Sequence, residues 1–325
     1  MKSIDQLTDI IHSGIEKINW KKEPRGLYEP IDYVLSLGGK RIRPLLTLMA
    51  CNIFSDNIEP ALNTALGLEI FHNFTLLHDD IMDRADVRRG QLTVHKKWND
   101  NTAILSGDVM QIESYRFIAK TPEKYLKQTL DLFSLTAAEI CEGQQYDVDF
   151  EKRDNVTGDE YLEMIRLKTA VLLGCSLKKG AWIGGAGEED AKNLYDLGIN
   201  IGLAFQLKDD ILDVYGDEST FGKKIGGDIL CNKKTYLLIQ ALGLAKENDA
   251  SELKNWLTIS NAESADKKIS AVTSVYNRLG VKAICEEKMQ YFYSKGISSL
   301  NKVSAPENKK KELRNLAEIL MFRQE

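Results

Sequence analysis

Hydrophobic residues recur along the chain with the spacing of α-helices. Two clear windows are YLEMIRLKTAVLLG at residues 161–174 and AKNLYDLGINIGLAFQLKDDILDVYG at residues 191–216, where apolar side chains return every three or four positions. The alternating pattern that is typical of strands is missing, and so are the Asn-Gly and Asp-Gly turns that join hairpin strands. The pattern predicts an all-α protein.

Prolines and glycines divide this helical pattern into segments. No proline falls between Glu123 and Ala305, so the pattern there can form long helices. The expected breaks between helices lie at Gly38-Gly39, Ser55–Pro60, Thr121-Pro122, Asp154–Gly158, Gly184–Gly187 and residues 216–234. Since none of these breaks is a long disordered linker, we expect one helical domain over residues 1–325.

Two of the predicted helices are apolar on nearly every side. Residues 61–83 read ALNTALGLEIFHNFTLLHDDIMD, and residues 197–213 have the same character. A helix without a polar face belongs in the middle of a bundle rather than on its surface. Each of the two ends in an acidic hexapeptide, HDDIMD at residues 78–83 and KDDILD at residues 208–213.

Composition narrows the class of protein further. The 325 residues carry a net charge of −5 and a sequence pI near 5.6, which argues against a nucleic-acid partner and a basic membrane anchor. The N-terminal segment does not read as a secretory signal, and no run approaches the roughly 18–20 apolar residues of a membrane span. Five scattered cysteines and four histidines predict reduced thiols in a cytoplasmic protein without a zinc site.

The two acidic hexapeptides carry the most specific chemistry. Positions i and i+4 share a helix face, so Asp79 and Asp83 project together with Asp80 beside them, and His72 lies on the same face. The second hexapeptide repeats this arrangement with Asp209, Asp210 and Asp213, and Gln206 lies on their face. Three carboxylates within one turn repel one another unless a cation sits among them, and hard oxygen ligands suit Mg²⁺. Two such clusters across a cavity would bind several Mg²⁺ ions with a diphosphate between them.

Basic stretches that contain glycine supply the other groups that phosphate oxygens need. They are GGKRIRP at residues 38–44, RRG at 88–90 and GDESTFGKKIGGDILCNKKT at 216–235. Arginine binds phosphate through two N–H groups, lysine acts as a point charge, and glycine lets backbone N–H groups approach. Each stretch has a structural alternative: GGKRIRP could be a helix start, RRG a basic last turn of a helix, and residues 216–235 a solvated loop. A single acidic cluster could likewise be a solvated helix end. The alternation of acidic clusters with basic stretches along one chain, however, indicates a metal–diphosphate site.

These motifs resemble those of the trans-isoprenyl diphosphate synthases, or polyprenyl synthetases. GGKRIRP, EIFHNFTLLHDDIMDRADVRRG, SGDVM, the Lys168-Thr169 pair and FQLKDDILDVYGD…GKKIGGD…NKKT occur in the order and spacing of that family over residues 36–236. The resemblance implies an isoprenoid synthase-type helical bundle around a deep central cavity, assembled as a homodimer. It also implies Mg²⁺-dependent condensation of isopentenyl diphosphate with allylic prenyl diphosphates (C5, C10 or C15).

The resemblance further implies roles for individual residues. The Mg²⁺ ligands would be Asp79, Asp80, Asp83, Asp209, Asp210 and Asp213. The isopentenyl diphosphate site would hold Lys40, Arg43, His72 and Arg89. The allylic diphosphate would contact Arg88, Lys168, Lys223 and Lys233. Catalysis at the carbocation would involve Lys168, Thr169 and Gln206, the last two through their oxygen dipoles.

Product length depends on the residues just before the first acidic cluster. Phe74 is fifth before Asp79, Thr75 is fourth, and the hexapeptide has no insertion, which resembles the geranylgeranyl (C20) type of the family. A small Thr75 opens about one helical turn, roughly 5 Å, above Phe71, which could be the floor of the prenyl pocket. Phe74 falls off that face, and both phenylalanines could be core residues. We expect a C20 product, with farnesyl (C15) as the alternative, and we do not expect products of C30 or longer.

Two other functions fit parts of the sequence. A class I terpene cyclase also uses a DDxxD cluster and Mg²⁺, but it usually lacks a second cluster and needs no isopentenyl diphosphate site such as GGKRIRP. A non-catalytic subunit of a heteromeric prenyl synthase would bind and regulate, but such subunits commonly lose acidic or basic motif residues, and none is lost here. Consumption of isopentenyl diphosphate by the chain alone distinguishes the synthase from both.

Overall fold

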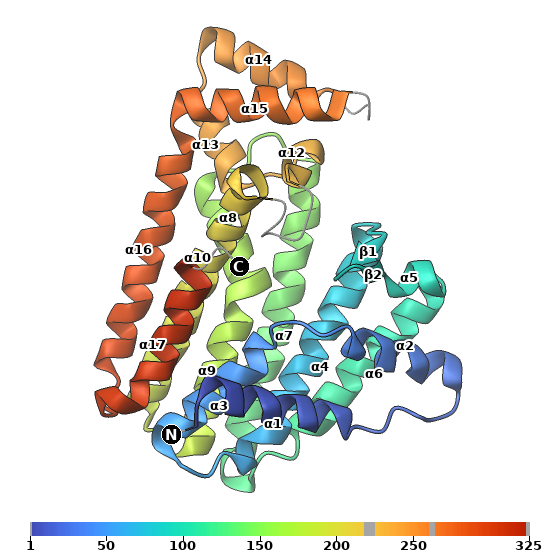
Figure 1. Ribbon diagram of the computed structural model, residues 1–325, viewed down its shortest axis with the longest axis vertical. Helices are drawn as coiled ribbons and strands as arrows, with labels where there is room; N and C mark the ends of the chain where they lie inside the picture. The colour runs from blue at the N-terminus through green and yellow to red at the C-terminus, as the bar shows by residue number, and fades with distance from the viewer. Residues whose placement is uncertain (1, 218–224, 260–263, 323–325) are drawn as a thin grey trace. The chain divides into compact units, whose positions relative to one another are not determined.

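The computed structural model describes residues 2–217, 225–259 and 264–322, and Figure 1 shows that they are almost entirely helical. This confirms the all-α prediction. None of the helices in the described part of the chain is both long and apolar enough to cross a membrane.

The elements follow one another with short connections. The first half of the chain forms α1 (Ile4–Glu16), α2 (Arg25–Ser36), α3 (Ile42–Phe54), α4 (Glu59–Met82), β1 (Val87–Arg88), β2 (Gln91–Leu92), α5 (Val94–Lys97), α6 (Asp100–Ile118) and α7 (Glu123–Glu151). The second half forms α8 (Gly158–Ile165), the π-helical turn η1 (Arg166–Ala170), α9 (Val171–Gly184), α10 (Glu188–Tyr215), α12 (Gly227–Leu230), α13 (Tyr236–Leu244), α14 (Glu247–Leu257), α15 (Ala265–Leu279), α16 (Val281–Lys302) and α17 (Glu307–Phe322). The other expected breaks lie between helices or at their ends. Of the break expected at residues 216–234, residues 218–224 lie outside the described residues and Gly227–Leu230 form α12.

The described chain divides into two compact units, each made of several chain segments. The first unit comprises Met1–Ser134, Cys175–Tyr195 and Val303–Leu313. The second comprises Leu135–Gly174, Asp196–Lys302 and Arg314–Glu325. Helices α7, α9, α10 and α17 each contribute residues to both units. The expectation of a single domain over residues 1–325 stays a prediction.

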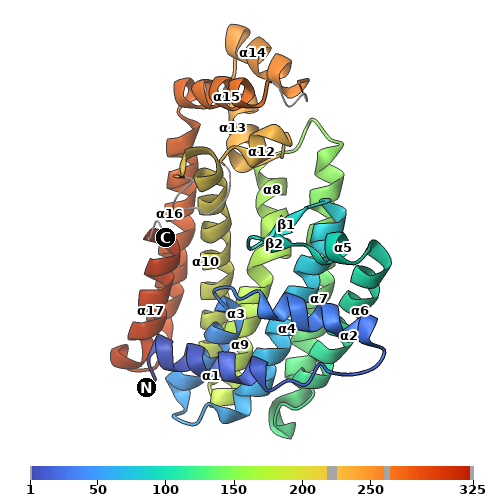
Figure 2. The same cartoon turned by 45° about the vertical axis from the view of Figure 1, so that its right-hand side comes forward.

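Helix α4 is the central helix of the first unit, as its apolar sequence predicted. It packs against α1, α2, α3, α5 and α6, and Figures 1 and 2 show it running beside α6. Leu68 and Phe71 are both at least 99% buried. At Gly67, a Cβ atom would lie 2.9 Å from the carbonyl oxygen of Ser114 on α6, so the two helices approach closely because this residue has no side chain.

The second half of α10 lies at the core of the second unit. Its buried residues Leu207 and Ile211 belong to one hydrophobic cluster with residues of α8, α13, α15 and α16. At Gly202 of α10, a Cβ atom would lie 2.6 Å from Cα of Ala170 in η1. This close approach places the π-helical turn directly against α10, where sequence motifs from both elements meet.

A small hairpin follows α4 and was not predicted. Strands β1 and β2 pair antiparallel, with Val87 opposite Leu92 and Arg88 opposite Gln91. The two turn residues, Arg89 and Gly90, have positive φ values of 53° and 74°, as a type I′ turn requires. The sequence offered an Arg-Gly pair here instead of the usual Asn-Gly or Asp-Gly.

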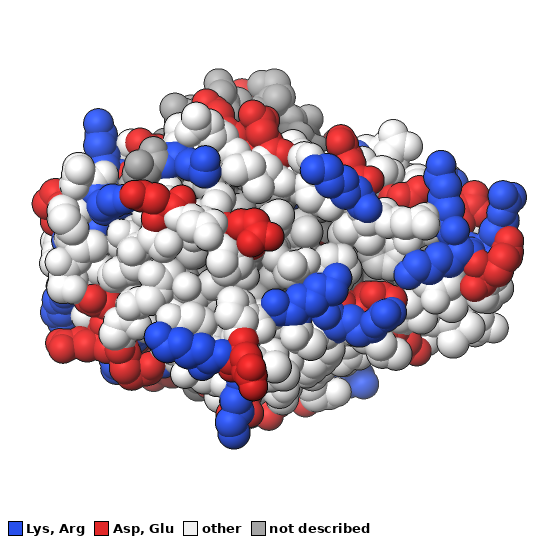
Figure 3. Space-filling model, turned by 90° about the horizontal axis from the view of Figure 1, so that it is seen from below, with Lys and Arg blue, Asp and Glu red and all other residues white. Residues whose placement is uncertain are grey.

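Charged side chains of both signs are spread over the surface. Figure 3 shows Lys and Arg side chains lying among Asp and Glu side chains on the face that it draws. This mixture agrees with a chain that has 43 basic and 48 acidic residues.

Candidate active site

The first acidic cluster occupies the last turn of α4. Asp79 is half-buried, Asp80 is 4% exposed and Asp83, the C-terminal cap of the helix, is exposed. Asp80 accepts two parallel hydrogen bonds from Arg88 of β1, at 2.8 Å from Nε to Oδ2 and 2.7 Å from Nη2 to Oδ1. The hairpin thus brings Arg88, a predicted phosphate ligand, into contact with Asp80, a predicted metal ligand.

Three of the four residues expected to bind isopentenyl diphosphate come together in the first unit. Nη1 of Arg43 on α3 lies 3.0 Å from Nε2 of His72 on α4. Burial and then the charge of Arg43 hold the pKa of His72 well below its usual 6.5, so its Nε2 accepts this hydrogen bond. Burial also lowers the pKa of Arg43 to about 10. The charges of Arg41, Arg88 and Arg89 act on His72 as well, so the imidazole faces a group of arginines.

The glycine pair before α3 holds the third of these residues. Arg89 donates from Nη1 to the carbonyl oxygen of Gly38. Gly39 has φ +122°, and a Cβ atom there would lie 2.8 Å from Cζ of Arg89. Glycine is therefore required both for the backbone conformation and for the approach of the guanidinium. Lys40, the fourth residue, follows directly and is exposed.

A buried ion pair anchors this basic segment and was missed from the sequence. Arg41 is 6% exposed, has φ +46°, and donates from Nη1 to Oε1 of Glu69 at 2.5 Å. Asn73, one turn further along α4, donates to the same oxygen at 2.8 Å. The signal was present, because an acid and an amide inside the apolar run 61–77 must find partners when buried.

The residues expected to set product length lie along α4, before the acidic cluster. Thr75 is half-buried and donates from Oγ1 to the carbonyl oxygen of His72 at 2.8 Å. Phe71 is 1% exposed, and its ring centroid lies 4.9 Å from that of Phe133 on α7. Phe74 contacts the rings of Phe71 at 5.4 Å and of His78 at 4.8 Å.

The second acidic cluster occupies α10 in the second unit. Asp210 is 2% exposed and accepts hydrogen bonds from the hydroxyl of Tyr161 and from Nε2 of Gln206 at 3.3 Å. Asp213 accepts a hydrogen bond from the backbone N–H of Asp228 at 3.0 Å. Burial, and then the charge of Asp228, raise the pKa of Asp210 to about 7 and that of Asp213 to about 6. Crowded carboxylates of this kind are what a bound cation stabilises.

At the second acidic cluster, Tyr161 and Asp228 are site residues that the sequence did not predict. Asp228 was present in the GGD motif, where only the glycines and lysines had been considered. Nothing in the sequence connects Tyr161 to Asp210, which lies 49 residues later.

The residues expected to face the carbocation also meet in the second unit. Thr169 of η1 donates from Oγ1 to Oε1 of Gln206 at 3.4 Å. Lys168 donates from Nζ to Oδ2 of Asp147 at 2.6 Å. The π-helical turn widens the backbone at this point, and a Cβ atom at Gly143 would lie 2.4 Å from the backbone nitrogen of Lys168. Such turns are frequent at functional sites because they redirect side chains.

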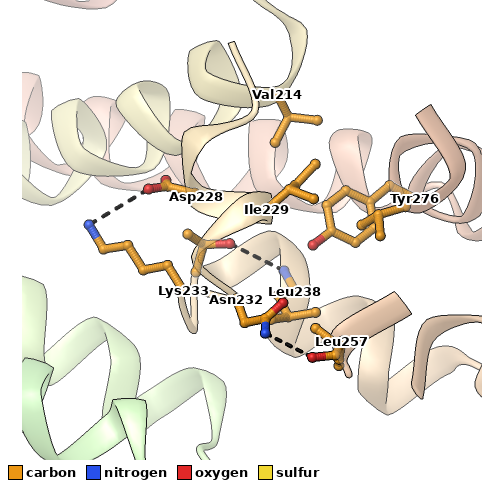
Figure 4. Close-up of a pocket in the computed structure, with 10 residues that line it drawn as sticks. Val214, Asp228, Ile229, Asn232, Lys233, Leu238, Leu257 and Tyr276 are labelled. Carbon is orange, nitrogen blue, oxygen red and sulfur yellow. Dashed lines mark hydrogen bonds and ion pairs between the residues drawn. The ribbon is translucent and has the colours of Figure 1, made fainter. Parts of the chain in front are cut away.

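Lys233 lies at a small pocket close to the second cluster. Figure 4 shows its Nζ directed toward Asp228, at 3.9 Å from Oδ1, with Tyr276 and Ile229 on the other side of the pocket. Asn232 has φ +53° and donates from Nδ2 to the carbonyl oxygen of Leu257 at 2.9 Å, which fixes the segment just before Lys233. The other lysine expected in this loop, Lys223, lies outside the described residues.

The donors at the two clusters fit Mg²⁺. Among the described residues, no group of three or more His, Cys, Asp or Glu side chains is placed to hold a metal by itself. Mg²⁺ at diphosphate sites, however, takes one or two carboxylates and completes its shell with water and phosphate oxygens. The carboxylates expected to do this are those of Asp79 and Asp83 at the first cluster and of Asp209 and Asp213 at the second.

Comparisons with known proteins give the family. The sequence model of the family described as polyprenyl synthetase matches residues 24–275. A geranylgeranyl diphosphate synthase of Methanosarcina mazei is 42% identical over 234 residues, which are 71% of this chain and 72% of that protein. One from Sulfolobus acidocaldarius is 34% identical over 325 residues, 98% of this chain and 96% of that protein. The crystal structure of a geranylgeranyl pyrophosphate synthase, at 45% identity, covers both chains completely with a TM-score of 0.94. The chain therefore belongs to the polyprenyl synthetase family of prenyltransferases.

Proposed function

We propose that this protein is a short-chain trans-prenyltransferase that condenses isopentenyl diphosphate with allylic diphosphates and releases geranylgeranyl diphosphate (C20). Family membership supports the reaction, and the two relatives and the solved structure described above carry the names of C20 synthases. A farnesyl (C15) product is the second candidate, because the ring of Phe74 contacts His78, which directly precedes the first acidic cluster.

The observation that carries the proposal is the contact between Arg43 and His72 beside Arg89. It gathers basic groups around an imidazole on which the charges of four arginines act. A diphosphate bound here would be held by protein N–H groups rather than through a metal. A terpene cyclase has no second diphosphate to bind, so this basic group favours the synthase.

The remaining basic residues suit the allylic diphosphate. Arg88 already binds the carboxylate of Asp80 through two oxygens, and a phosphate group offers the same pair of acceptors. Lys168 and Lys233 each pair with a carboxylate, Asp147 and Asp228, and can exchange that partner for phosphate oxygens. Mg²⁺ bound by Asp79 and Asp83 at the first cluster, or by Asp209 and Asp213 at the second, would neutralise charge on the departing diphosphate.

The proposed reaction balances without a protein nucleophile. The C1–O bond of the allylic diphosphate breaks, and its electron pair remains on the diphosphate. The double bond of isopentenyl diphosphate then forms a carbon–carbon bond to the allylic C1. The proton at C2 of the isopentenyl unit passes to the released diphosphate, which creates the new allylic double bond. Three such cycles from a C5 starter give C20.

The oxygen dipoles of Thr169 and Gln206 would stabilise the allylic cation. Their mutual hydrogen bond orients both side chains, and Asp210 holds the amide of Gln206 from the other side. Fixed dipoles of this kind stabilise developing charge without reorganising during the reaction.

We also propose that the enzyme is a homodimer that pairs through α6. Ile104, Leu105 and Ile112 are 43%, 57% and 60% exposed on that helix, which is an unusual amount of apolar surface to leave in water. Light scattering should give the mass of a dimer for the wild type and of a monomer for Ile112→Glu. Leu244→Glu, at a 43% exposed position on α13, is the matched control and should leave the dimer intact. A monomeric wild type would contradict this part of the proposal.

The five free cysteines fit the expected reducing cytoplasm.

The first experiment is incubation with labelled isopentenyl diphosphate, Mg²⁺ and each starter (C5, C10 and C15), with product length read by chromatography. A final product of C20 supports the proposal. A final product of C15 would support the proposed reaction but change the assigned product to farnesyl diphosphate. Cyclised hydrocarbon from the allylic substrate alone would indicate a cyclase. If no starter leads to isopentenyl incorporation, the protein is not a synthase by itself, and a non-catalytic subunit of a heteromeric prenyl synthase becomes the better explanation.

A further inference from the structure

A lysine with an unusual environment lies in the first unit. Lys179 of α9 has no solvent exposure, and no described residue forms a hydrogen bond with its Nζ. The contact that the amine does make is with the ring of Phe133 on α7, 4.7 Å from Nζ to the centroid. The preceding residue, Lys178, is ordinary by comparison, because its Nζ pairs with Glu188 at 2.6 Å.

Phe133 connects this lysine to the residues expected to set product length. Its ring packs edge-on against Phe71 at 4.9 Å and against Tyr115 of α6 at 4.7 Å. Phe133 has no solvent exposure, so its ring is held between Phe71, Tyr115 and the amine of Lys179. Phe71 therefore rests on an aromatic ring that is itself backed by a buried cation.

We propose that Lys179 is a positioning residue for product length, which acts through Phe133 to keep the floor of the prenyl pocket at Phe71. This inference rests on the proposed synthase function. It adds a residue on α9 to the α4 positions that the sequence pointed to.

Phe71 lies within reach of a growing prenyl chain. Phe71 precedes Asp79 by eight residues, which is about 12 Å along the axis of α4. A growing chain whose diphosphate is held at the acidic end of α4 would reach Phe71 with its hydrocarbon tail. To grow past that level, the tail must push aside the ring of Phe71 or that of Phe133.

The amine makes this displacement costly. If the ring of Phe133 moves, the amine of Lys179 loses its contact with the face of that ring. The hydrocarbon tail then lies beside an ammonium group that has no hydrogen-bond partner among the described residues. With methionine at position 179, an unbranched side chain that is one atom shorter would back the ring without a charge, so that the ring could yield. The variant should then accept one more isoprene unit.

The experiment compares wild type, Lys179→Met and the control Lys178→Met with labelled isopentenyl diphosphate and a C15 starter. We expect C20 from wild type and Lys178→Met, and a C25 fraction that is about tenfold larger in Lys179→Met. Lys179→Arg keeps the cation and should release C20. The rate of the first condensation from a C5 starter should match in all variants, because a five-carbon tail does not reach Phe71.

The outcomes separate this inference from the proposed function. If wild type incorporates no isopentenyl unit, the synthase proposal fails. If wild type makes C20 and Lys179→Met, folded by its thermal transition, also stops at C20, then the synthase proposal stands and the role of Lys179 is overturned. A slower Lys179→Met with unchanged product lengths would likewise show that the lysine is only structural.

Discussion

Arg41 and Glu69 form an ion pair in the core of the first unit, at 2.5 Å and with side chains that are 4% and 2% exposed. The pair fixes Arg41 between Lys40 and Arg43, which are both expected to bind isopentenyl diphosphate. Glu69→Gln would leave the charge of Arg41 buried without a counter-ion. We expect a loss of about 3–5 kcal/mol in the free energy of unfolding, measured by chemical denaturation. The KM for isopentenyl diphosphate should rise as well.

The control for this change is Lys127→Ala. Lys127 and Asp131 also lie 2.5 Å apart, but their side chains are 89% and 62% exposed. Water screens such a pair, so its removal should leave stability unchanged. Equal stability of Glu69→Gln and wild type would contradict the anchoring role of the buried pair.

The bond between Arg88 and Asp80 predicts that these two residues act as one unit in catalysis. Asp80→Asn and Arg88→Lys each destroy the two-pronged geometry, and each should lower kcat/KM for the allylic substrate by at least about tenfold. The double variant should be little worse than either single variant. Losses that multiply in the double variant would show that the two residues act independently.

The hydroxyl of Tyr161 predicts a stability effect at the second acidic cluster. Tyr161→Phe removes a hydrogen bond to the buried carboxylate of Asp210 and should lower the free energy of unfolding by about 2 kcal/mol. It should also lower kcat, since Asp210 orients Gln206. Tyr215→Phe is the control, because no described residue forms a hydrogen bond with that buried hydroxyl. A similar loss from both changes would mean that ring packing is being measured instead.

Close packing at Gly143 predicts that a single methyl group disturbs the π-helical turn. In Gly143→Ala, the new Cβ would lie 2.4 Å from the backbone nitrogen of Lys168, so α7 or the turn must shift. We expect a loss of about 1–3 kcal/mol in stability and a fall in kcat of about a hundredfold, because Lys168 and Thr169 move. At Gly243, an exposed position near the end of α13, a Cβ meets nothing within 4 Å, and Gly243→Ala should stabilise by about 0.5–1 kcal/mol. An active, stable Gly143→Ala would refute the packing argument.

Helical periodicity was enough to predict the parts of the site that lie on one face of a helix. It placed Gln206 on the acidic face of α10, and the structure shows Gln206 in contact with Asp210. This contact could be predicted because the repeat of a helix fixes which neighbours share a face, whatever the rest of the chain does. The position of His72 on the acidic face of α4 stays a prediction.

Contacts that depend on tertiary structure could not be read in this way. Nothing local to GGKRIRP shows that Arg41, rather than Lys40 or Arg43, turns into the core, because this depends on a positive φ and on Glu69. The hairpin was missed because its turn is made by Arg89 and Gly90, an uncommon pair for such a turn.

Lys179 also escaped notice, since a lysine inside a helical pattern usually reaches solvent. Burial lowers its pKa from 10.5 to about 8, and the thiol of Cys175, one turn earlier on α9, opposes this only in part. An unfolded chain would bind a proton at this lysine up to pH 10.5, but the folded chain gives it up above about pH 8. Below pH 8 the buried charge therefore destabilises the fold fully, and between pH 8 and 10.5 this destabilisation fades.

Lys179→Met should consequently stabilise the protein, and the gain should depend on pH. At pH 7 we expect an increase of about 3 kcal/mol in the free energy of unfolding, which corresponds to the lowered pKa. The difference from wild type should shrink as the pH rises from 8 to 10.5. Denaturant titrations of wild type, Lys179→Met and Lys178→Met over this range would measure it, with other titrating groups cancelling in the differences. If the gain in stability stays constant with pH, then the difference in stability between methionine and lysine at this position comes from packing and not from a buried charge.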